Sequence, residues 1–532
     1  MKVTWLMVFT QSSLLKMINF LYKNFSISLQ LFFLRISFGK NNYKNFKDLN
    51  FKQNDFINYK TVKYYILKNN FITNINIQDV HTFNFLFFYQ KLGGKKGIEL
   101  SKKNIFLWFK KFKYYKKFPW STEDASKRFI NLLYSYDFIC SISNKKEIAQ
   151  INKILNFHIK RISFEVGLKK ADNMSSSEIL ALVLIESCKK SLNTKIIKKI
   201  DSLINIQIDE NSVHKSYNIL EHAKFLNNLI EIRNIFLFFN IRTSQNFENN
   251  ILAMTSVLKT YQHADSSLPL FNGCNNNYIK TIEQIFEKEQ FVKTKKLTKF
   301  KNGIVVHKDS KKILFFDVVQ PSNNGFHNQL SSGSLSIEIS AHGEKIITNC
   351  GGSEIGGKNP TYLKYTAAHS TIILDNTNVS EIKESGFNTN FVKNVNFEAK
   401  DEENLLILSG THNGYLTNYK KICKRTLFIN KKNESLRGED TIISSKSIIE
   451  KNVYHIRFHL MPDISTTLTE NKKNIIIKTK KNNIWIFKSN KEIVIEKSIF
   501  VKNDVANETN QIVISGVTSS LNTKVEWSLE KK

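Results

Sequence analysis

Residues 326–375 read FHNQLSSGSLSIEISAHGEKIITNCGGSEIGGKNPTYLKYTAAHSTIILD, and this stretch decides the fold. Two of its runs, Leu335–Ser340 and Ser370–Leu374, have the alternating character that is typical of half-buried strands. They flank a glycine-rich loop that begins at Asn349, and the tetrapeptide Ala367–Ser370 leads into the second run. The stretch therefore predicts two strands with a long connection between them.

The sequence that follows residue 295 shows the same strand-like pattern. Short runs alternate with period two, and the turns between them contain Asn, Gly and Lys. This spacing favours an antiparallel sandwich. The strand candidates are Ile304–His307, Ile313–Val318, Leu335–Ser340, Ser370–Leu374, Leu405–Ser409, Arg425–Ile429, Ile475–Lys478 and Ile493–Glu496.

The sequence before residue 295 has helical spacing instead. Ser175–Glu178 is a capping-box signature, and the apolar run Ile179–Ile185 that follows predicts a buried helix. Ile219–Phe239 places its apolar residues near one stripe, and Trp120–Glu123 opens a further helix. Residues 240–295 predict a polar connector with some helix. The spacing does not distinguish a helical bundle from a toroid.

The composition indicates a large globular protein with an excess of positive charge. Of 532 residues 41% are hydrophobic, and 78 Lys and Arg against 46 Asp and Glu give a formal charge of +32. Such an excess suits a polyanionic partner. The abundance of Lys, Asn, Ile and Phe, with only 5 prolines, is equally consistent with an AT-rich genome.

Cysteine spacing and hydropathy exclude some classes of protein. Five scattered cysteines without a CxxC pair predict neither a disulfide framework nor a structural zinc site. No run reaches the roughly 18 apolar residues of a membrane span. Residues 1–25 match a secretory signal poorly, because Gln11, Ser12, Ser13 and Lys16 interrupt the apolar run. Export is left open.

Further motifs in the second half point to a known family. With the LSIEIS, NCG and AAHS segments of the opening stretch, they resemble the C-terminal domain of the heparinase II/III-like polysaccharide lyases, and the alphaproteobacterial members most of all. In chain order these motifs are Ser409–Tyr415 (SGTHNGY), Cys423–Leu427 (CKRTL), Leu436–Asp440 (LRGED), Ile456–Asp463 (IRFHLMPD) and Gln511–Ile514 (QIVI).

The resemblance implies an architecture. An α/α toroid would be followed by an antiparallel β-sandwich, with a basic, aromatic and partly helical segment at residues 1–105, the toroid at 106–295 and the sandwich at 296–532. In the helical part the resemblance is weaker. Asp209–Tyr217 takes the place of a family DGGHxxRxP segment, and only Asp209 and Lys215 agree with it.

The resemblance also implies chemistry. These lyases cleave uronate chains by β-elimination: the C5 carboxylate is neutralised, a base removes the C5 proton and an acid protonates the departing oxygen. On this basis the catalytic candidates are His369, His327, Tyr217 and His214. The candidates for substrate binding are Lys215, Arg457, Asn349 and His459.

Several family positions carry different residues. The two histidines of the family HAH motif fall on Gln329 and Ser331, and a zinc set known in some members falls on Ser331, Asn349 and His369. One good zinc ligand of three does not hold a zinc ion, so neither a metal nor any other cofactor is predicted. For the asparagine that binds the substrate carboxylate, position alone suggests Asn173.

Each candidate also has a structural interpretation. His369 is equally well explained as a buried histidine at a sheet edge, and Arg457 with His459 as a buried polar network. His214 is equally consistent with a solvated turn. His412 and Tyr415 are better explained as residues that organise a turn.

The sequence leaves three possible functions to be compared. The first is β-elimination of an acidic, heparin-, heparan- or alginate-like glycan in the cell envelope or periplasm. The second is a catalytically silent relative that binds or helps to assemble envelope polysaccharide. The third, nucleic-acid binding by Tyr64–Tyr65 and Tyr114–Tyr115 among lysines, is not expected. The oligomeric state is left open.

Overall fold

The computed structural model describes residues 77–113, 119–188, 192, 194–289, 303–321, 326, 329–353, 360–383, 388–390, 392, 394–445, 450–502, 504–519 and 521–532. The chain divides into two compact units, of which one contains Asp79–Asn193 and the other Thr194–Lys532. His327, Tyr64–Tyr65 and Tyr114–Tyr115 lie outside the described residues. The domain boundaries at 105 and 295 stay predictions.

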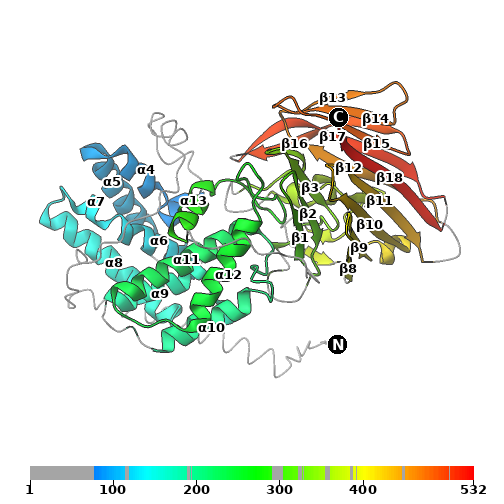
Figure 1. Cartoon of the computed structure of the whole chain (residues 1–532). Coiled ribbons are helices and arrows are strands. Elements are labelled where there is room, and N and C mark those ends of the chain that lie inside the picture. The colour runs from blue at the N-terminus through cyan, green and yellow to red at the C-terminus, as the bar shows by residue number, and fades with distance from the viewer. Residues whose placement is uncertain are drawn as a thin grey trace, which may run out of the picture. The chain divides into compact units, whose positions relative to one another are not determined.

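The first unit is helical (Figure 1). Helix α6 begins after Ser121, whose Oγ accepts a hydrogen bond from the backbone N–H of Asp124 at 3.1 Å. The capping box predicted before α9 is present, because Ser175 and Glu178 each accept a hydrogen bond from the other's backbone N–H. The helices are α3 (Ile77–Thr82), α4 (Phe85–Leu92), α5 (Gly94–Phe112), α6 (Thr122–Tyr134), α7 (Tyr136–Cys140), α8 (Lys145–Glu165), the 3₁₀ turn η2 (Ala171–Asn173) and α9 (Ser176–Cys188).

The second unit begins with four more helices. They are α10 (Thr194–Gln207), α11 (Ile219–Phe238), α12 (Gln245–Thr260) and α13 (Ile279–Lys288). The helix predicted at Ile219–Phe239 is confirmed, and Asn218 caps it by accepting from Leu220 N at 2.9 Å. In the described part of the segment predicted as a polar connector, residues 240–289, Ser244 caps α12, and apolar residues of both α12 and α13 are buried. This part is more helical than expected.

Two eight-stranded antiparallel sheets follow in the same unit. The first has the order β1-β2-β3-β4-β12-β17-β16, with β5 paired to β12; the second has the order β13-β14-β15-β18-β11-β10-β9-β8, and β6 pairs with β7 separately. The strands of the first sheet are β1 (Gly303–Lys308), β2 (Lys312–Val318), β3 (Ile337–Ala341), β4 (Glu344–Thr348), β5 (Ile372–Leu374), β12 (Val453–Leu460), β16 (Ile493–Lys502) and β17 (Val505–Val517). The others are β6 (Glu381–Ile382), β7 (Asn388–Asn390), β8 (Val395–Asp401), β9 (Leu405–His412), β10 (Lys421–Asn430), β11 (Leu436–Ser444), β13 (Ser465–Leu468), β14 (Asn474–Lys478), β15 (Ile484–Ser489) and β18 (Asn522–Lys531).

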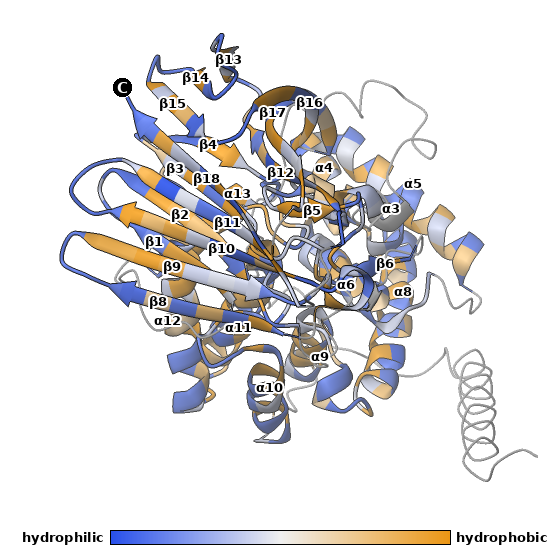
Figure 2. Ribbon diagram, turned by 90° about the vertical axis from the view of Figure 1, so that its right-hand side faces the viewer, coloured by the Kyte–Doolittle hydropathy of each residue, from blue (hydrophilic) through white to orange (hydrophobic). Residues whose placement is uncertain are grey.

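The predicted fold class, helices followed by an antiparallel sandwich, is confirmed. All eight predicted runs overlap strands, six of them completely, while the run Ser370–Leu374 begins two residues before β5. Figure 2 shows hydrophobic residues along the strands of both sheets. Strand β3 starts two residues later than predicted. Leu335 adopts a left-handed backbone conformation with φ of 62°, and its N–H donates to Asp317 O outside the regular ladder. Within the described residues no helix has both the length and the apolar character to cross a bilayer.

A buried arginine connects the two sheets. Arg425 on β10 donates to both carboxylate oxygens of Asp440 on β11, at 2.7 and 2.9 Å. Its Nη1 donates to the carbonyl oxygens of Leu335 and Ser370, which precede β3 and β5 of the other sheet, at 2.9 and 2.7 Å. Trp527 also donates to Asp440, at 2.9 Å. These contacts explain why the CKRTL and LRGED motifs occur together, since a planar guanidinium is needed to satisfy all four acceptors.

We expect Arg425→Lys to lower the free energy of unfolding by roughly 1–3 kcal/mol, because an ammonium cannot reach all four acceptors that the guanidinium satisfies, and at least one stays buried without a donor. Urea unfolding measures this loss. The matched control is Arg437→Lys on the exposed side of β11, for which a change within about 0.5 kcal/mol is expected. Equal effects of the two substitutions would contradict the role given to Arg425.

Candidate functional site

The turn that joins α10 to α11 holds three of the predicted site residues. Asp209 begins the turn, and its Oδ1 accepts hydrogen bonds from the N–H groups of Asn211 and Val213 at 2.9 and 2.8 Å. Two accepted backbone bonds from one carboxylate hold the turn in a single conformation. This explains why Asp209 is one of the two residues that agree with the family segment.

His214 and Tyr217 lie on this turn and are both buried. The His214 ring bonds to Ser216 Oγ at 2.8 Å and meets the Phe326 ring edge-on, with ring centroids 4.9 Å apart. Burial lowers the pKa of His214 to about 4, so its imidazole is neutral at pH 7. Burial, with the neighbouring Asp209, raises the pKa of the Tyr217 hydroxyl, so the tyrosine keeps its proton.

Lys215 points back along α10. Its Nζ donates to the carbonyl oxygen of Ile206 at 2.5 Å and to that of Asn205 at 3.3 Å. A cation at the last carbonyls of a helix is stabilised by those groups and by the helix dipole. In this conformation Lys215 caps α10, and its role in substrate binding stays a prediction.

Asn272 connects the turn to the sandwich. Its side chain donates to Tyr217 O at 3.3 Å and accepts from Ser331 N at 2.9 Å, while its own carbonyl accepts from Asn218 Nδ2 at 3.0 Å. Ser331 is one of the positions where the family carries histidine. The structure therefore brings the His214–Tyr217 turn and the Ser331 segment to one place.

A cavity opens beside this connection. It is lined by Asn272, Asp317, Val319, Pro321, Leu330, Ser331, Ser334 and Ser380, and we name it the Asp317 cavity. Burial raises the pKa of Asp317 to about 7, although Val319 N donates to its Oδ1 at 3.0 Å. A carboxyl that titrates near neutral pH inside a cavity has the properties expected of a functional group.

His369, Asn349 and His459 are all buried. His369 Nδ1 bonds to Tyr365 O at 2.9 Å, and its ring packs so closely on Gly333 that a Cβ there would lie 2.3 Å from Cδ2. Asn349 accepts from Ser370 N at 2.9 Å, and His459 bonds to Ser498 Oγ at 2.7 Å and Ala367 O at 3.0 Å. Burial lowers the pKa of His369 to about 4 and that of His459 to about 3.

The remaining predicted residues lie elsewhere. Arg457 on β12 forms an ion pair with Glu496 on β16, with 2.9 Å between Nη1 and Oε2. Asn173 is exposed on η2 in the first unit. His412 accepts from Gly414 N at 3.2 Å and Tyr415 donates to Thr377 O at 3.0 Å, which agrees with their predicted role in a turn.

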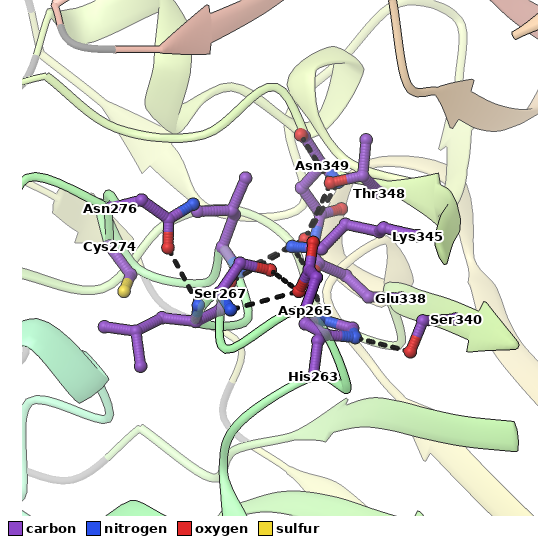
Figure 3. Close-up of polar contacts among 12 residues, drawn as sticks. His263, Asp265, Ser267, Cys274, Asn276, Glu338, Ser340, Lys345, Thr348 and Asn349 are labelled. Atoms are coloured by element: carbon purple, nitrogen blue, oxygen red, sulfur yellow. Dashed lines mark hydrogen bonds and ion pairs between the residues drawn. The ribbon is translucent and has the colours of Figure 1, made fainter. Parts of the chain in front are cut away.

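A buried carboxylate next to Asn349 forms a second polar centre (Figure 3). Glu338 Oε2 lies 3.0 Å from His263 Nε2 and 3.1 Å from Lys345 Nζ. Its Oε1 accepts from the N–H groups of Leu270 and Asn349, both at 3.1 Å, and from Thr348 Oγ1 at 3.1 Å. The donors come from the segment after α12, from β4 and from the loop after β4.

The protonation states of this centre follow from its geometry. Burial lowers the pKa of His263 to about 4, helped by the charge of Lys345, so His263 is neutral and donates a hydrogen bond to Glu338. Burial alone would raise the pKa of Glu338. The charge of Lys345 and the bond from His263 outweigh this effect and lower the pKa to about 2. The ion pair of the centre is therefore Glu338 with Lys345.

Several residues of these sites were not predicted. Four of them belong to no functional motif and reach the sites only through the fold: Asp317, Asn272, His263 and Lys345. Glu338 could have been noticed in the sequence, because it is the acidic residue of the LSIEIS run that carries part of the family resemblance.

The zinc set of the family does not fit this chain. In the described residues no group of three His, Cys, Asp or Glu side chains is placed to hold a metal ion. Asn349, where the zinc-binding members carry aspartate, bonds instead to Ser370 and Glu338. Burial raises the pKa of the nearby Cys350 thiol to about 12, so it supplies no thiolate ligand.

The fold defines the class of protein: a helical region is followed by a two-sheet antiparallel sandwich. Residues 294–528 match the family model described as heparinase II/III-like, C-terminal. These residues therefore form a heparinase II/III-like C-terminal domain. No curated protein sequence matches it at a significant level.

Solved structures agree on the fold over nearly the whole chain. A crystal structure of heparinase III is similar with a TM-score of 0.72 and 12% identity, over 97% of this chain and 91% of the other. A second heparinase III structure is similar with a TM-score of 0.63 and 12% identity, and the match covers 97% of this chain and 91% of the other. The heparan sulfate lyase HepC from Pedobacter heparinus is similar with a TM-score of 0.57 and 13% identity, and the match covers 95% of this chain and 88% of the other. At these identities the likeness concerns the fold alone.

We expect Lys345→Met to lower the free energy of unfolding by roughly 3–5 kcal/mol, because it leaves the Glu338 carboxylate buried without its cation. Urea unfolding at neutral pH measures the loss. Lys480→Met is the matched control, since its side chain is 78% exposed and a change within about 0.5 kcal/mol is expected. A Lys345→Met protein as stable as the control would contradict the role of this ion pair.

We expect Asp317→Asn to change how stability depends on pH. Between the ordinary pKa of 3.8 and the raised value of about 7, the folded protein retains a proton that the unfolded chain has released. The free energy of unfolding therefore falls with rising pH in this window, and Asp317→Asn removes up to about 4 kcal/mol of that fall. Urea unfolding at about pH 5 and about pH 8 tests this difference; parallel behaviour of the two proteins would contradict it.

Proposed function

We propose that the protein is a polysaccharide lyase that binds an acidic, uronate-containing glycan and cleaves it by β-elimination. The observation that supports the proposal most is the connection through Asn272, because it places the His214–Tyr217 turn beside the segment where the family carries histidine. The formal charge of +32 favours a polyanionic substrate. A cell-envelope or periplasmic location belongs to the same proposal.

The protonation states suggest how the two residues would share the reaction. Neutral His214 would accept the C5 proton, and the electron pair of that bond forms the C4–C5 double bond while the C4–O bond breaks. Tyr217 would donate its proton to the departing oxygen. Burial makes His214 a weaker base and Tyr217 a weaker acid, so it opposes both transfers in the closed turn. Both side chains are buried, so this division requires the turn to open toward the substrate.

A second function has its own support. His369, the histidine that matches the family motif best, is buried against Gly333, and Gln329 and Ser331 replace the other family histidines. A chain with this arrangement is suited to bind an envelope polysaccharide without cleaving it. This catalytically silent binder is the alternative that the experiment must separate from a lyase.

The test follows the ultraviolet absorbance of the unsaturated uronate product, with purified protein and heparan sulfate, heparin or alginate. We expect product to form, and Tyr217→Phe to lower kcat by roughly 100-fold or more, since general acid–base groups contribute that much. Tyr362→Phe, a tyrosine 51% exposed on the surface, serves as the matched control and should retain the full rate.

Three outcomes separate the functions. Activity that Tyr217→Phe abolishes supports the lyase with Tyr217 in its site. Activity that Tyr217→Phe leaves unchanged removes Tyr217 from the mechanism. Binding of a glycan without any product would contradict the lyase and support the silent binder.

A further inference from the structure

The Asp317 cavity offers hydrogen-bonding groups that the proposed elimination does not use. Its free space is that of about one small polar group, too little for a sugar ring. Its walls are mostly polar, and no Lys or Arg is among the described residues that line it. A ligand would therefore extend a single neutral polar group into it and keep the remainder of the molecule outside.

Two of the polar groups have hydrogen-bonding capacity to spare. In the described part of the chain, the Asp317 carboxylate accepts a single hydrogen bond, from Val319 N at 3.0 Å. Ser331 Oγ is buried and has no hydrogen-bond partner among the described residues, although its backbone N–H is held by Asn272. A free acceptor and a free hydroxyl in one small cavity are costly unless a ligand or water satisfies them.

We propose that this cavity is a sugar-hydroxyl subsite, in which the Asp317 carboxylate accepts a hydrogen bond from one hydroxyl of the bound polysaccharide and Ser331 Oγ donates to the same hydroxyl. A hydroxyl both donates and accepts, so it matches this pair of groups. A carboxylate or sulfate of the glycan matches less well, because Asp317 would repel it and the described residues that line the cavity include no cation. The inference rests on the proposed binding of an acidic glycan, and it holds whether or not the glycan is cleaved.

Binding at this subsite is coupled to pH. A hydroxyl that donates to the carboxylate favours its charged form, so binding releases a proton where free Asp317 is still protonated. The titratable groups that interact with Asp317 are Tyr217 on the α10–α11 turn and Tyr261 at the end of α12, and Asp209 acts on both tyrosines. Burial keeps the two tyrosines neutral, so neither releases a proton. Burial also raises the pKa of Asp209, so Asp209 is the one other group among these described residues that could release the proton in place of Asp317.

The experiment is isothermal titration calorimetry of the full chain with heparan sulfate oligosaccharides, at about pH 6 and about pH 8, in buffers of different ionisation enthalpy. We expect tighter binding at the higher pH and the release of a proton at the lower one. Asp317→Asn should abolish the release and weaken binding at the higher pH by roughly tenfold to a hundredfold, the usual effect of a charged hydrogen bond.

Two variants serve as controls. Asp209→Asn should retain the proton release, and Asp463→Asn, whose side chain is 70% exposed, should bind as the original protein does. The subsite would be overturned if the Asp317→Asn protein still released the proton on binding, or if Asp209→Asn abolished that release. Either result would leave the binding of the glycan itself standing. Binding without cleavage would contradict the lyase and leave the subsite standing, whereas absence of binding at both pH values would overturn both.

Discussion

The buried carboxylate of Glu338 is the constraint on which the second unit depends. A carboxylate removed from water must be compensated by cations and hydrogen bonds. Here Lys345 supplies the charge, and His263, Thr348 and the backbone N–H groups of Leu270 and Asn349 supply the hydrogen bonds. Because these donors come from the loop after α12, from β4 and from the loop after β4, the carboxylate fixes the α12 loop to the sandwich.

The candidate site depends on that attachment. The loop fixed at Leu270 continues into Asn272, which holds both Tyr217 and Ser331 and lines the Asp317 cavity. Gly333, two residues after Ser331, leaves room for the His369 ring to pack against the same segment. The site is therefore built where a helical turn, a loop and a sheet segment meet, and no one of these elements forms it alone.

The sequence predicted the elements better than the site. Period-two runs such as Ile313–Val318 and the capping box at Ser175 are local signals, and the structure confirms them. Asp317 lies in one of those runs, yet the cavity beside it is lined by residues distant in sequence, such as Asn272, which belongs to no motif. His369 was visible as a motif, but its packing on Gly333 depends on a close approach that no spacing reveals.

The central claim, that Glu338 attaches the loop after α12 to the sandwich, is tested most directly by hydrogen exchange of the backbone N–H groups of Leu270 and Asn349. In the unaltered protein both should exchange as slowly as the core strands, and Glu338→Gln should speed both together while the interior of α12 stays protected. Fast exchange at Leu270 in the unaltered protein, or unchanged exchange in Glu338→Gln, would contradict the claim.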